Sequence, residues 1–206
     1  VEGVFGAPPE FVALQIRTVL RDIGADSIKI GMLGTAPVIE AVADALREFP
    51  GIPVVLDPVM AAKSGDRLLE ERAAEAMIRE LFPLAEVVTP NLPELETLSG
   101  MAVAETAGTD ANGADADSGQ ALQAASKAAA KLLALGAGAV LVKGGHLEGE
   151  HAVDALYMQS GDPEGGLRTN TESIKDTAAA NLTLANPRIA TANTHGTGCT
   201  YSSAIA

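Results

Sequence analysis

The sequence is poor in aromatic residues, in basic residues and in cysteine. Aromatic side chains make up 3% of the 206 residues, and there is no tryptophan. A core must therefore be built from Ala, Val, Leu and Ile, which suits helices layered on a buried sheet. Lys and Arg number 14 against 27 Asp and Glu. This acidic balance argues against a nucleic-acid surface, because phosphate backbones are bound by clustered Lys and Arg.

A single cysteine excludes an internal disulfide framework and is compatible with a reducing cytoplasm. No apolar run is long enough to span a bilayer. We therefore expect a cytoplasmic protein that binds neither nucleic acid nor a membrane. The chain begins without Met and stops at SSAIA, within a pattern typical of a helix that has just begun. We expect residues 1–206 to form a single domain that is a fragment of a longer protein.

Short apolar runs alternate with helical patterns along the chain. The spacing predicts strands over 27–33, 53–60, 86–91, 139–145 and 151–158, and helices over 9–23, 35–49, 66–82, 92–100 and 121–135. This alternation is typical of an α/β fold with a mainly parallel sheet and helices on both faces. Two polar segments, 104–120 and 159–186, are predicted to be surface insertions.

In parallel sheets, ligands bind beyond the carboxyl ends of the strands. The positions that follow the predicted strands here are Gly31, Met32, Asp57, Asn91, Glu94, Lys143 and the loop from Thr194 to Cys199. They comprise three groups able to hold a metal, one cation and a glycine loop that opens a helix. This combination indicates a site for nucleotide phosphates.

The glycine loop is the anion-binding candidate. Gly196 and Gly198 let the backbone approach a ligand, and the helix N-terminus favours negative charge. A glycine pair that only turns the chain is the alternative. Lys143 follows four apolar residues and precedes two glycines, so we expect its ammonium to contact phosphate rather than solvent alone.

Oxygen-bearing side chains at two strand ends suit Mg²⁺, which keeps several waters and bridges phosphates. Asp57 follows the strand PVVL, and Asn91 and Glu94 lie three residues apart at the start of a short helix. The alternatives are a turn residue at position 57 and a helix cap at position 91. Their joint placement at strand ends favours a metal site.

Cys199 has two readings. A lone cysteine is most often a buried small hydrophobe. At a helix N-terminus the residue can instead take a proton from an attacking hydroxyl during phosphoryl transfer. His195 is the competing base, and the spacing of the residues alone does not decide between the two.

Five motifs together resemble the bacterial hydroxymethylpyrimidine and phosphomethylpyrimidine kinases of thiamine biosynthesis, which have a ribokinase-like fold. The motifs are KIGMLG (29–34), VVLDPVMAAKSGDRLL (54–69), VVTPNLPELETLSG (87–100), VLVKGGH (140–146) and NTHGTGCTYSSAIA (193–206). They occur in the family's order. The resemblance covers most of the chain outside the two insertions.

The resemblance implies ATP- and Mg²⁺-dependent phosphorylation of 4-amino-5-hydroxymethyl-2-methylpyrimidine and then of its monophosphate. It makes residues 1–206 a kinase domain that lacks the family's N-terminal strands and last helices. By the same resemblance Cys199 replaces the aspartate base of the wider ribokinase group. The resemblance also implies an anion hole formed by Gly196, Thr197, Gly198 and Cys199 beside Thr194, and a phosphate contact at Lys143. It implies metal ligands at Asp57, Asn91 and Glu94, and a pyrimidine pocket lined by Met32.

Two other functions stay open at this point. Some related pyridoxal kinases share the GTGC ending, and a relative that binds ligand without turnover would keep the same fold. The presence of Asp57, Glu94, Lys143 and Cys199 together argues against lost turnover. Related kinases often dimerise, which makes a homodimer an expectation of the resemblance.

Overall fold

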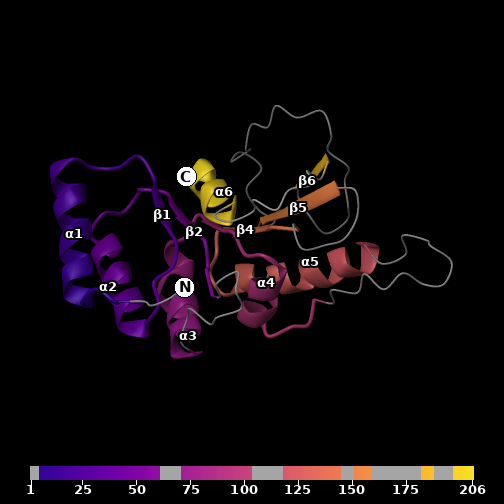
Figure 1. The fold of residues 1–206 in the computed structure, drawn as a ribbon, viewed down its shortest axis with the longest axis horizontal. Coiled ribbons are helices and arrows are strands. Elements are labelled where there is room, and N and C mark those ends of the chain that lie inside the picture. The colour runs from indigo at the N-terminus through magenta and orange to yellow at the C-terminus, as the bar shows by residue number, and fades with distance from the viewer. Residues whose placement is uncertain (1–4, 61–70, 104–117, 145–150, 159–181, 188–196) are drawn as a thin grey trace. The chain divides into compact units, whose positions relative to one another are not determined.

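The computed structural model describes residues 5–60, 71–103, 118–144, 151–158, 182–187 and 197–206 (Figure 1). Contacts group the chain into two compact units. Unit 1 comprises Val1–Thr89, Leu135–Gly138 and Asn193–Ala206, and unit 2 comprises Pro90–Ala134 and Ala139–Ala192. The single domain expected from the sequence stays a prediction. Each unit is described separately below.

Unit 1 is built from three short parallel strands and the helices that connect them. Its elements are α1 (Pro9–Asp22), β1 (Ile28–Ile30), α2 (Ala36–Arg47), β2 (Val54–Leu56), α3 (Glu71–Glu80), the 3-10 helix η1 (Phe82–Leu84), β3 (Val87–Val88) and α6 (Thr197–Ile205). β2 pairs in parallel with β1 on one side and with β3 on the other. The parallel arrangement predicted from the strand–helix alternation is therefore confirmed for these strands.

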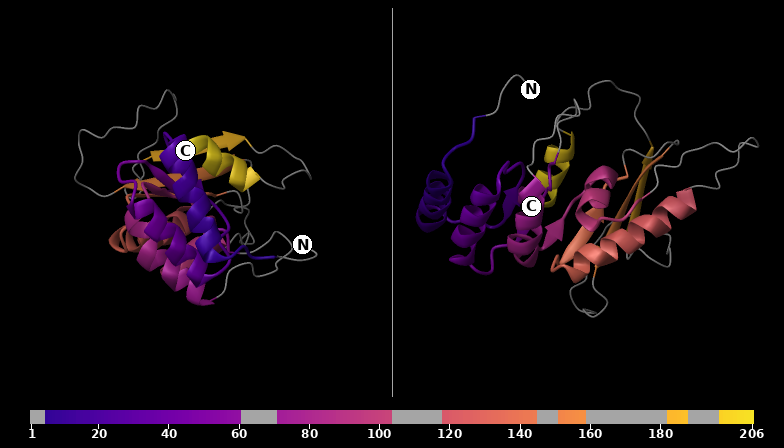
Figure 2. Two further views of the ribbon diagram at one scale, coloured as in Figure 1. Left: turned by 90° about the vertical axis from the view of Figure 1, so that its left-hand side faces the viewer. Right: turned by 90° about the horizontal axis from the view of Figure 1, so that it is seen from below.

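Helix α2 forms the centre of the helical layer of unit 1. It packs against α1 and α3, and Figure 2 shows the three helices side by side. The residues Ile39, Val42, Ala43 and Leu46 recur at helical spacing and are all buried. β2 is buried along its whole length, as expected for a strand with neighbours on both sides.

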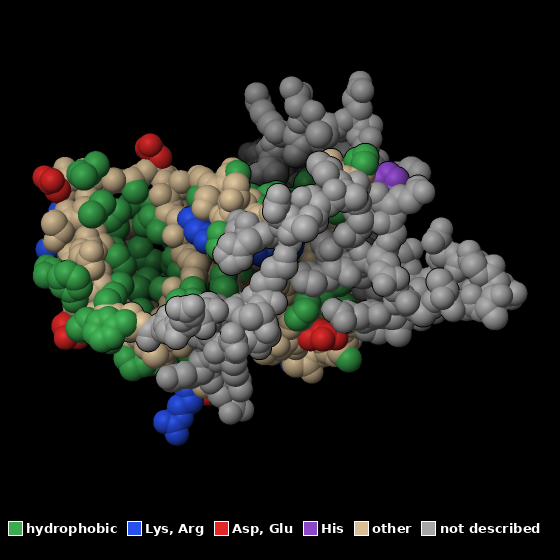
Figure 3. All heavy atoms as spheres, viewed as in Figure 1, with side chains coloured by type: hydrophobic (Ala, Val, Ile, Leu, Met, Phe, Trp, Pro, Cys, Tyr) green, Lys and Arg blue, Asp and Glu red, His purple; other side chains and the backbone are tan. Residues whose placement is uncertain are grey.

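Helix α1 covers residues predicted as helical, but much of its apolar face is exposed. Phe11, Leu14 and Ile23 expose 52%, 57% and 79% of their surface. Figure 3 shows hydrophobic side chains at the surface of this face of the molecule. The reason is that α2 is the main packing partner of α1 among the described elements.

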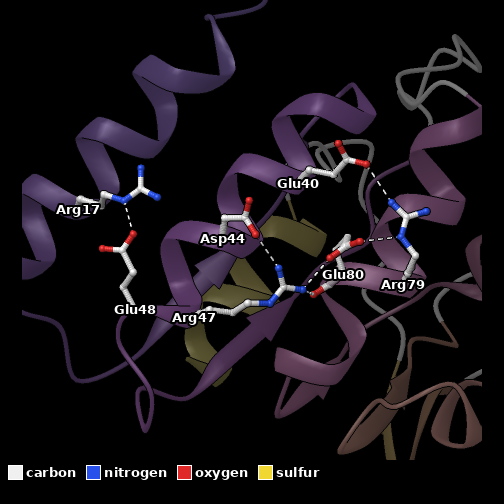
Figure 4. A network of polar contacts seen from close by, with 7 residues as sticks. All are labelled: Arg17, Glu40, Asp44, Arg47, Glu48, Arg79 and Glu80. Carbon is white, nitrogen blue, oxygen red and sulfur yellow. Dashed lines mark hydrogen bonds and ion pairs between the residues drawn. The ribbon is translucent and has the colours of Figure 1, made fainter.

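Charged side chains connect α1, α2 and α3 along the outer face of these helices (Figure 4). Arg47 Nη2 lies 2.7 Å from Glu80 Oε2, and Arg79 Nε lies 2.6 Å from Glu80 Oε1. Arg79 also reaches Glu40, at 2.9 Å. Glu80 thus accepts hydrogen bonds from two guanidinium groups. The bond from Arg47 is the largest cause, and the bond from Arg79 the second, of a carboxyl pKa below the ordinary 4.5.

Replacing Glu80 with glutamine is expected to lower the Tm at pH 7 and to have a smaller effect below about pH 4. Because the folded-state pKa of Glu80 is lowered, its ionised form contributes stability above the unfolded pKa, and that contribution disappears as the pH falls through the folded value. Thermal unfolding at the two pH values measures the difference. Glu75→Gln, an exposed position on the same helix, is the control. An equal loss of Tm at both pH values would contradict an ionic contribution.

Unit 2 contains α4 (Leu92–Ser99), α5 (Ser118–Ala134), β4 (Ala139–Val142), β5 (His151–Met158) and β6 (Leu182–Pro187). β5 pairs antiparallel with β4 and with β6. The antiparallel direction follows from the short connection between β4 and β5, which leaves no length for a crossover helix. Tyr157 lies in the core of this unit, and burial raises the pKa of its hydroxyl to about 12.

The predicted insertions differ from the structure at their ends. Residues 118–120 begin helix α5, and residues 182–186 belong to strand β6, where Leu182 is buried and pairs with Leu156. Composition predicted loop at these ends, because the polar residues of an edge strand and of a first helical turn resemble loop residues. The rest of both segments, 104–117 and 159–181, lies outside the described residues.

The remaining predicted elements have counterparts in the structure. Helix 66–82 is present as α3 over the part that is described, and helix 92–100 ends at Gly100, which has a positive φ of 64°. Within the described ranges, no helix has both the length and the apolar character needed to cross a bilayer.

Candidate active site

The carboxyl ends of β1, β2 and β3 lie at one edge of unit 1. The main-chain N–H of Asp57 donates to Ile30 O at 2.9 Å, and that of Thr89 donates to Leu56 O at 2.9 Å. These bonds continue the parallel ladder for one residue beyond each strand. Asp57 is therefore held between the ends of β1 and β3, as the sequence predicted for a residue at this edge.

The carboxylate of Asp57 is buried, and three donors among the described side chains lie close to it. Its residue exposure is 1%. Thr89 Oγ1 lies 3.4 Å from Oδ1, Ser202 Oγ lies 3.1 Å from Oδ2, and Lys29 Nζ lies 3.7 Å from Oδ2. A buried carboxylate requires this kind of compensation, because an isolated charge would lose its hydration without replacement.

Helix α6 carries the predicted phosphate loop and base. Thr197, Gly198 and Cys199 form its first turn, and Cys199 is exposed. The buried-hydrophobe reading of this cysteine is therefore wrong. α6 contacts β2 within unit 1. Thr194, His195 and Gly196 lie outside the described residues.

Met32 follows β1 by two residues and is 46% exposed. Exposure of a large apolar side chain beyond a strand end is compatible with contact to a planar ligand. Its assignment to a pyrimidine pocket stays a prediction.

In unit 2, Asn91 and Glu94 form the N-terminal cap of α4. Asn91 Oδ1 accepts from the main-chain N–H of Glu94 at 2.8 Å, and Glu94 Oε2 accepts from the main-chain N–H of Asn91 at 2.8 Å. This reciprocal pair is a capping box. The helix-cap reading of Asn91 is thereby confirmed, and Glu94, which is 7% exposed, is its partner.

Lys143 lies next to this cap. Its main-chain N–H donates to Pro90 O at 2.8 Å, and it forms a parallel bridge with Asn91. The structure therefore brings the backbones of Lys143 and Asn91 together at one edge, as the sequence predicted. Lys143 itself is half-buried.

The chain after Lys143 packs tightly against β5. A Cβ added at Gly144 would overlap the carbonyl oxygen of Val153 and lie 2.9 Å from its carbonyl carbon. The Gly144 main-chain N–H donates to Asp154 Oδ1 at 2.9 Å. Position 144 is thus restricted to glycine by space, and one carboxylate of β5 holds it.

Sequence reasoning missed four polar residues of these two sites: Lys29, Thr89, Ser202 and Asp154. A charge within an apolar strand was an available signal for Lys29 in SIKIG and for Asp154 in HAVDAL. Thr89 and Ser202 carried no such signal, because single hydroxyl residues are common at strand ends and in helices.

The oxygen donors of Asn91 and Glu94 have the chemistry that Mg²⁺ prefers. Asp57 fits a divalent cation less well, because Lys29 already places a positive charge beside Oδ2. Among the described residues, no cluster of three or more His, Cys, Asp or Glu side chains is placed to hold a metal. Asp57 belongs to unit 1 and the other two to unit 2, so the shared metal shell stays a prediction.

The α/β fold, with an exposed thiol in the first turn of a helix and polar side chains beyond parallel strands, is that of the ribokinase-like class. Within that class the family is clear. The phosphomethylpyrimidine kinase family matches residues 1–206, and this chain belongs to it.

Individual relatives agree with this assignment. The hydroxymethylpyrimidine/phosphomethylpyrimidine kinase of Escherichia coli is 38% identical over 206 residues, which are 100% of this chain and 65% of that protein. The chain thus spans just under two thirds of that relative.

Two solved structures are also similar. The phosphomethylpyrimidine kinase of Clostridium difficile is 34% identical with a TM-score of 0.61, over 78% of this chain and 63% of that one. An ADP complex of Bacillus subtilis pyridoxal kinase is 33% identical with a TM-score of 0.71, over 98% of this chain and 62% of that one. The family kinases and the pyridoxal kinases therefore share one fold.

Proposed function

We propose that the protein transfers the γ-phosphoryl group of ATP to 4-amino-5-hydroxymethyl-2-methylpyrimidine and then to its monophosphate, as a step of thiamine biosynthesis. The observation that carries this proposal is the family match over all 206 residues. It is supported by the identity of 38% with a kinase of this name from Escherichia coli. Binding of ADP by the Bacillus subtilis pyridoxal kinase supports ATP as the phosphoryl donor.

In this proposal the first turn of α6 binds the transferring phosphate. Thr197 and Gly198 begin α6, where main-chain N–H groups point along the helix axis and the helix dipole adds positive potential. Thr194 and Gly196 are proposed to extend the same anion hole. Lys143 contributes a further positive charge to the phosphates.

Cys199 acts as the general base. The substrate hydroxyl loses its proton to the Cys199 thiolate while its oxygen bonds to the γ-phosphorus, and the bond from that phosphorus to the β,γ-bridging oxygen breaks to release ADP. The exposure of Cys199 on the first turn of α6 supports access to a bound substrate. Met32 is proposed to contact the pyrimidine ring.

Mg²⁺ is the proposed metal, and Asn91 and Glu94 are the residues that would hold it together with the phosphates; Asp57 was predicted as a third ligand. When bound, this ion neutralises charge on the phosphate oxygens. We also propose a cytoplasmic location, supported by the lone cysteine, and a homodimer, for which the resemblance is the support.

Measuring ATP-dependent ADP release by the intact protein with hydroxymethylpyrimidine, its monophosphate and pyridoxal tests the proposal. We expect kcat/KM for the pyrimidine alcohol to exceed that for pyridoxal by at least about tenfold, the discrimination that one or two well-placed pocket contacts supply. Preference for pyridoxal would instead identify a pyridoxal kinase. ATP binding without turnover of any of the three would indicate a ligand-binding relative.

A further inference from the structure

Among the described residues, the side chains that contact Asp57 come from three separate segments of unit 1. Lys29 belongs to β1, Thr89 follows β3, and Ser202 lies in α6. Both carboxylate oxygens accept from these donors, and the residue is 1% exposed. The contact with Ser202 joins positions that are 145 residues apart in the sequence.

Lys29 places its ammonium group beside Asp57 Oδ2. The Lys29 side chain is 19% exposed and its Nζ lies 3.7 Å from this oxygen. A Cβ at position 31 would lie 2.9 Å from the same Nζ, so Gly31 provides the space through which Lys29 reaches the carboxylate. A divalent cation on Oδ2 would be repelled by this ammonium at close range.

Ser202 connects Asp57 to the turn of α6 that bears Cys199. Its hydroxyl lies 3.1 Å from Asp57 Oδ2 and also 3.1 Å from the carbonyl oxygens of Gly198 and Cys199. A hydroxyl has one proton to donate, and an ionised carboxylate is the stronger acceptor. The carboxylate bond therefore ties α6 to the end of β2 at a point three residues beyond Cys199.

We propose that Asp57 is a positioning residue that anchors the N-terminal turn of α6 through Ser202, with Lys29 neutralising its charge, rather than a magnesium ligand. In this proposal the role of Cys199 as the base rests on the proposed function. Its physical basis is geometric, because a base that shifts by about 1 Å from the reacting hydroxyl loses up to about a hundredfold in rate.

The lone cysteine provides a direct measurement of this anchoring. Cys199 is the sole thiol of the chain and is exposed, so its rate of alkylation by iodoacetamide reports the environment of the first turn of α6 without any substrate. The informative variant is Ser202→Ala, which leaves the contact between Asp57 and Lys29 in place. Ser203→Ala is the matched control, because Ser203 donates to the same Cys199 carbonyl at 2.8 Å and is exposed.

We expect Ser202→Ala to change the alkylation rate about threefold or more and to lower kcat by about tenfold or more, with Ser203→Ala close to wild type. Asp57→Asn should also lower kcat, and the Mg²⁺ concentration that gives half-maximal activity should stay unchanged in both variants. A merely structural role of Ser202 would reduce the Tm while leaving the alkylation rate and kcat of the folded enzyme unchanged.

Two results would overturn the positioning role. One is an increase of about tenfold or more in the half-maximal Mg²⁺ concentration of Asp57→Asn, the behaviour of a lost ligand. The other is wild-type alkylation and turnover in Ser202→Ala. If the wild-type protein phosphorylates no pyrimidine alcohol, the proposed function fails, and the alkylation comparison still decides whether Asp57 anchors α6.

Discussion

Replacing Cys199 with alanine is expected to lower kcat by about 10²-fold or more, the range associated with loss of a general base. The alanine variant keeps the helix and its main-chain N–H groups, since α6 begins at Thr197 and alanine is a strong helix former. ATP binding should therefore change little. Single-turnover phosphorylation at saturating ATP, with ATP affinity measured separately by titration, distinguishes the two quantities.

The partner variant Cys199→Asp adds a second test of the same role. Because an aspartate occupies this place in the wider ribokinase group, a carboxylate here should recover at least about tenfold of the activity lost in the alanine variant. Near wild-type turnover in Cys199→Ala would eliminate this thiol as the base. His195 would then be the residue to replace next.

Local sequence patterns were sufficient to predict most elements of the fold. The helical spacing in 9–23 and 35–49 corresponds to α1 and α2, and the apolar run before Asp57 corresponds to β2. These signals are strong because each depends on residues a few positions apart. The direction of β5 was not specified, since it depends on the length of a connection and on pairing with β6 rather than on the strand's own residues.

The candidate site was predictable in its main-chain positions and not in its side-chain contacts. The sequence placed Asp57 and Lys143 at strand ends, and the structure places them there. It offered two readings of Asn91, and the cap reading is confirmed by the pair with Glu94. Two of the donors to Asp57, Thr89 and Ser202, could not be foreseen, because they come from segments that lie close together only in the folded chain.

The proposed anchoring role of Asp57 and the proposed base at Cys199 belong to one arrangement within unit 1. A helix N-terminus binds a phosphate usefully only when its position is fixed before the substrate arrives, since rigid placement removes the cost of reorganisation during the reaction. The bond from Ser202 to a buried carboxylate supplies such a fixed point three residues beyond Cys199. In the proposed mechanism, this bond is what preorganises the anion hole at the start of α6.

Replacing Gly144 with alanine is the second change for which we expect a large effect. The new methyl group would overlap the carbonyl oxygen of Val153, and its neighbour is main chain of β5, which cannot rotate away as a side chain can. Relief requires separating β4 from β5, at a cost of about 3 kcal/mol or more. For a chain of this length, that cost corresponds to a fall of about 10 °C in Tm.

Two variants separate the steric cause from other effects of the substitution. Gly6→Ala places the same methyl group where nothing lies within 4 Å, and its Tm should match that of the wild type. Asp154→Ala removes the acceptor of the Gly144 N–H but adds no bulk, so its cost should be limited to about 1–2 kcal/mol. If Gly144→Ala unfolded at the wild-type temperature, the close packing of residue 144 on β5 would be wrong. Because residue 144 directly follows Lys143, the proposed phosphate contact, the folded fraction of Gly144→Ala should also show a raised KM for ATP, which Gly6→Ala should not.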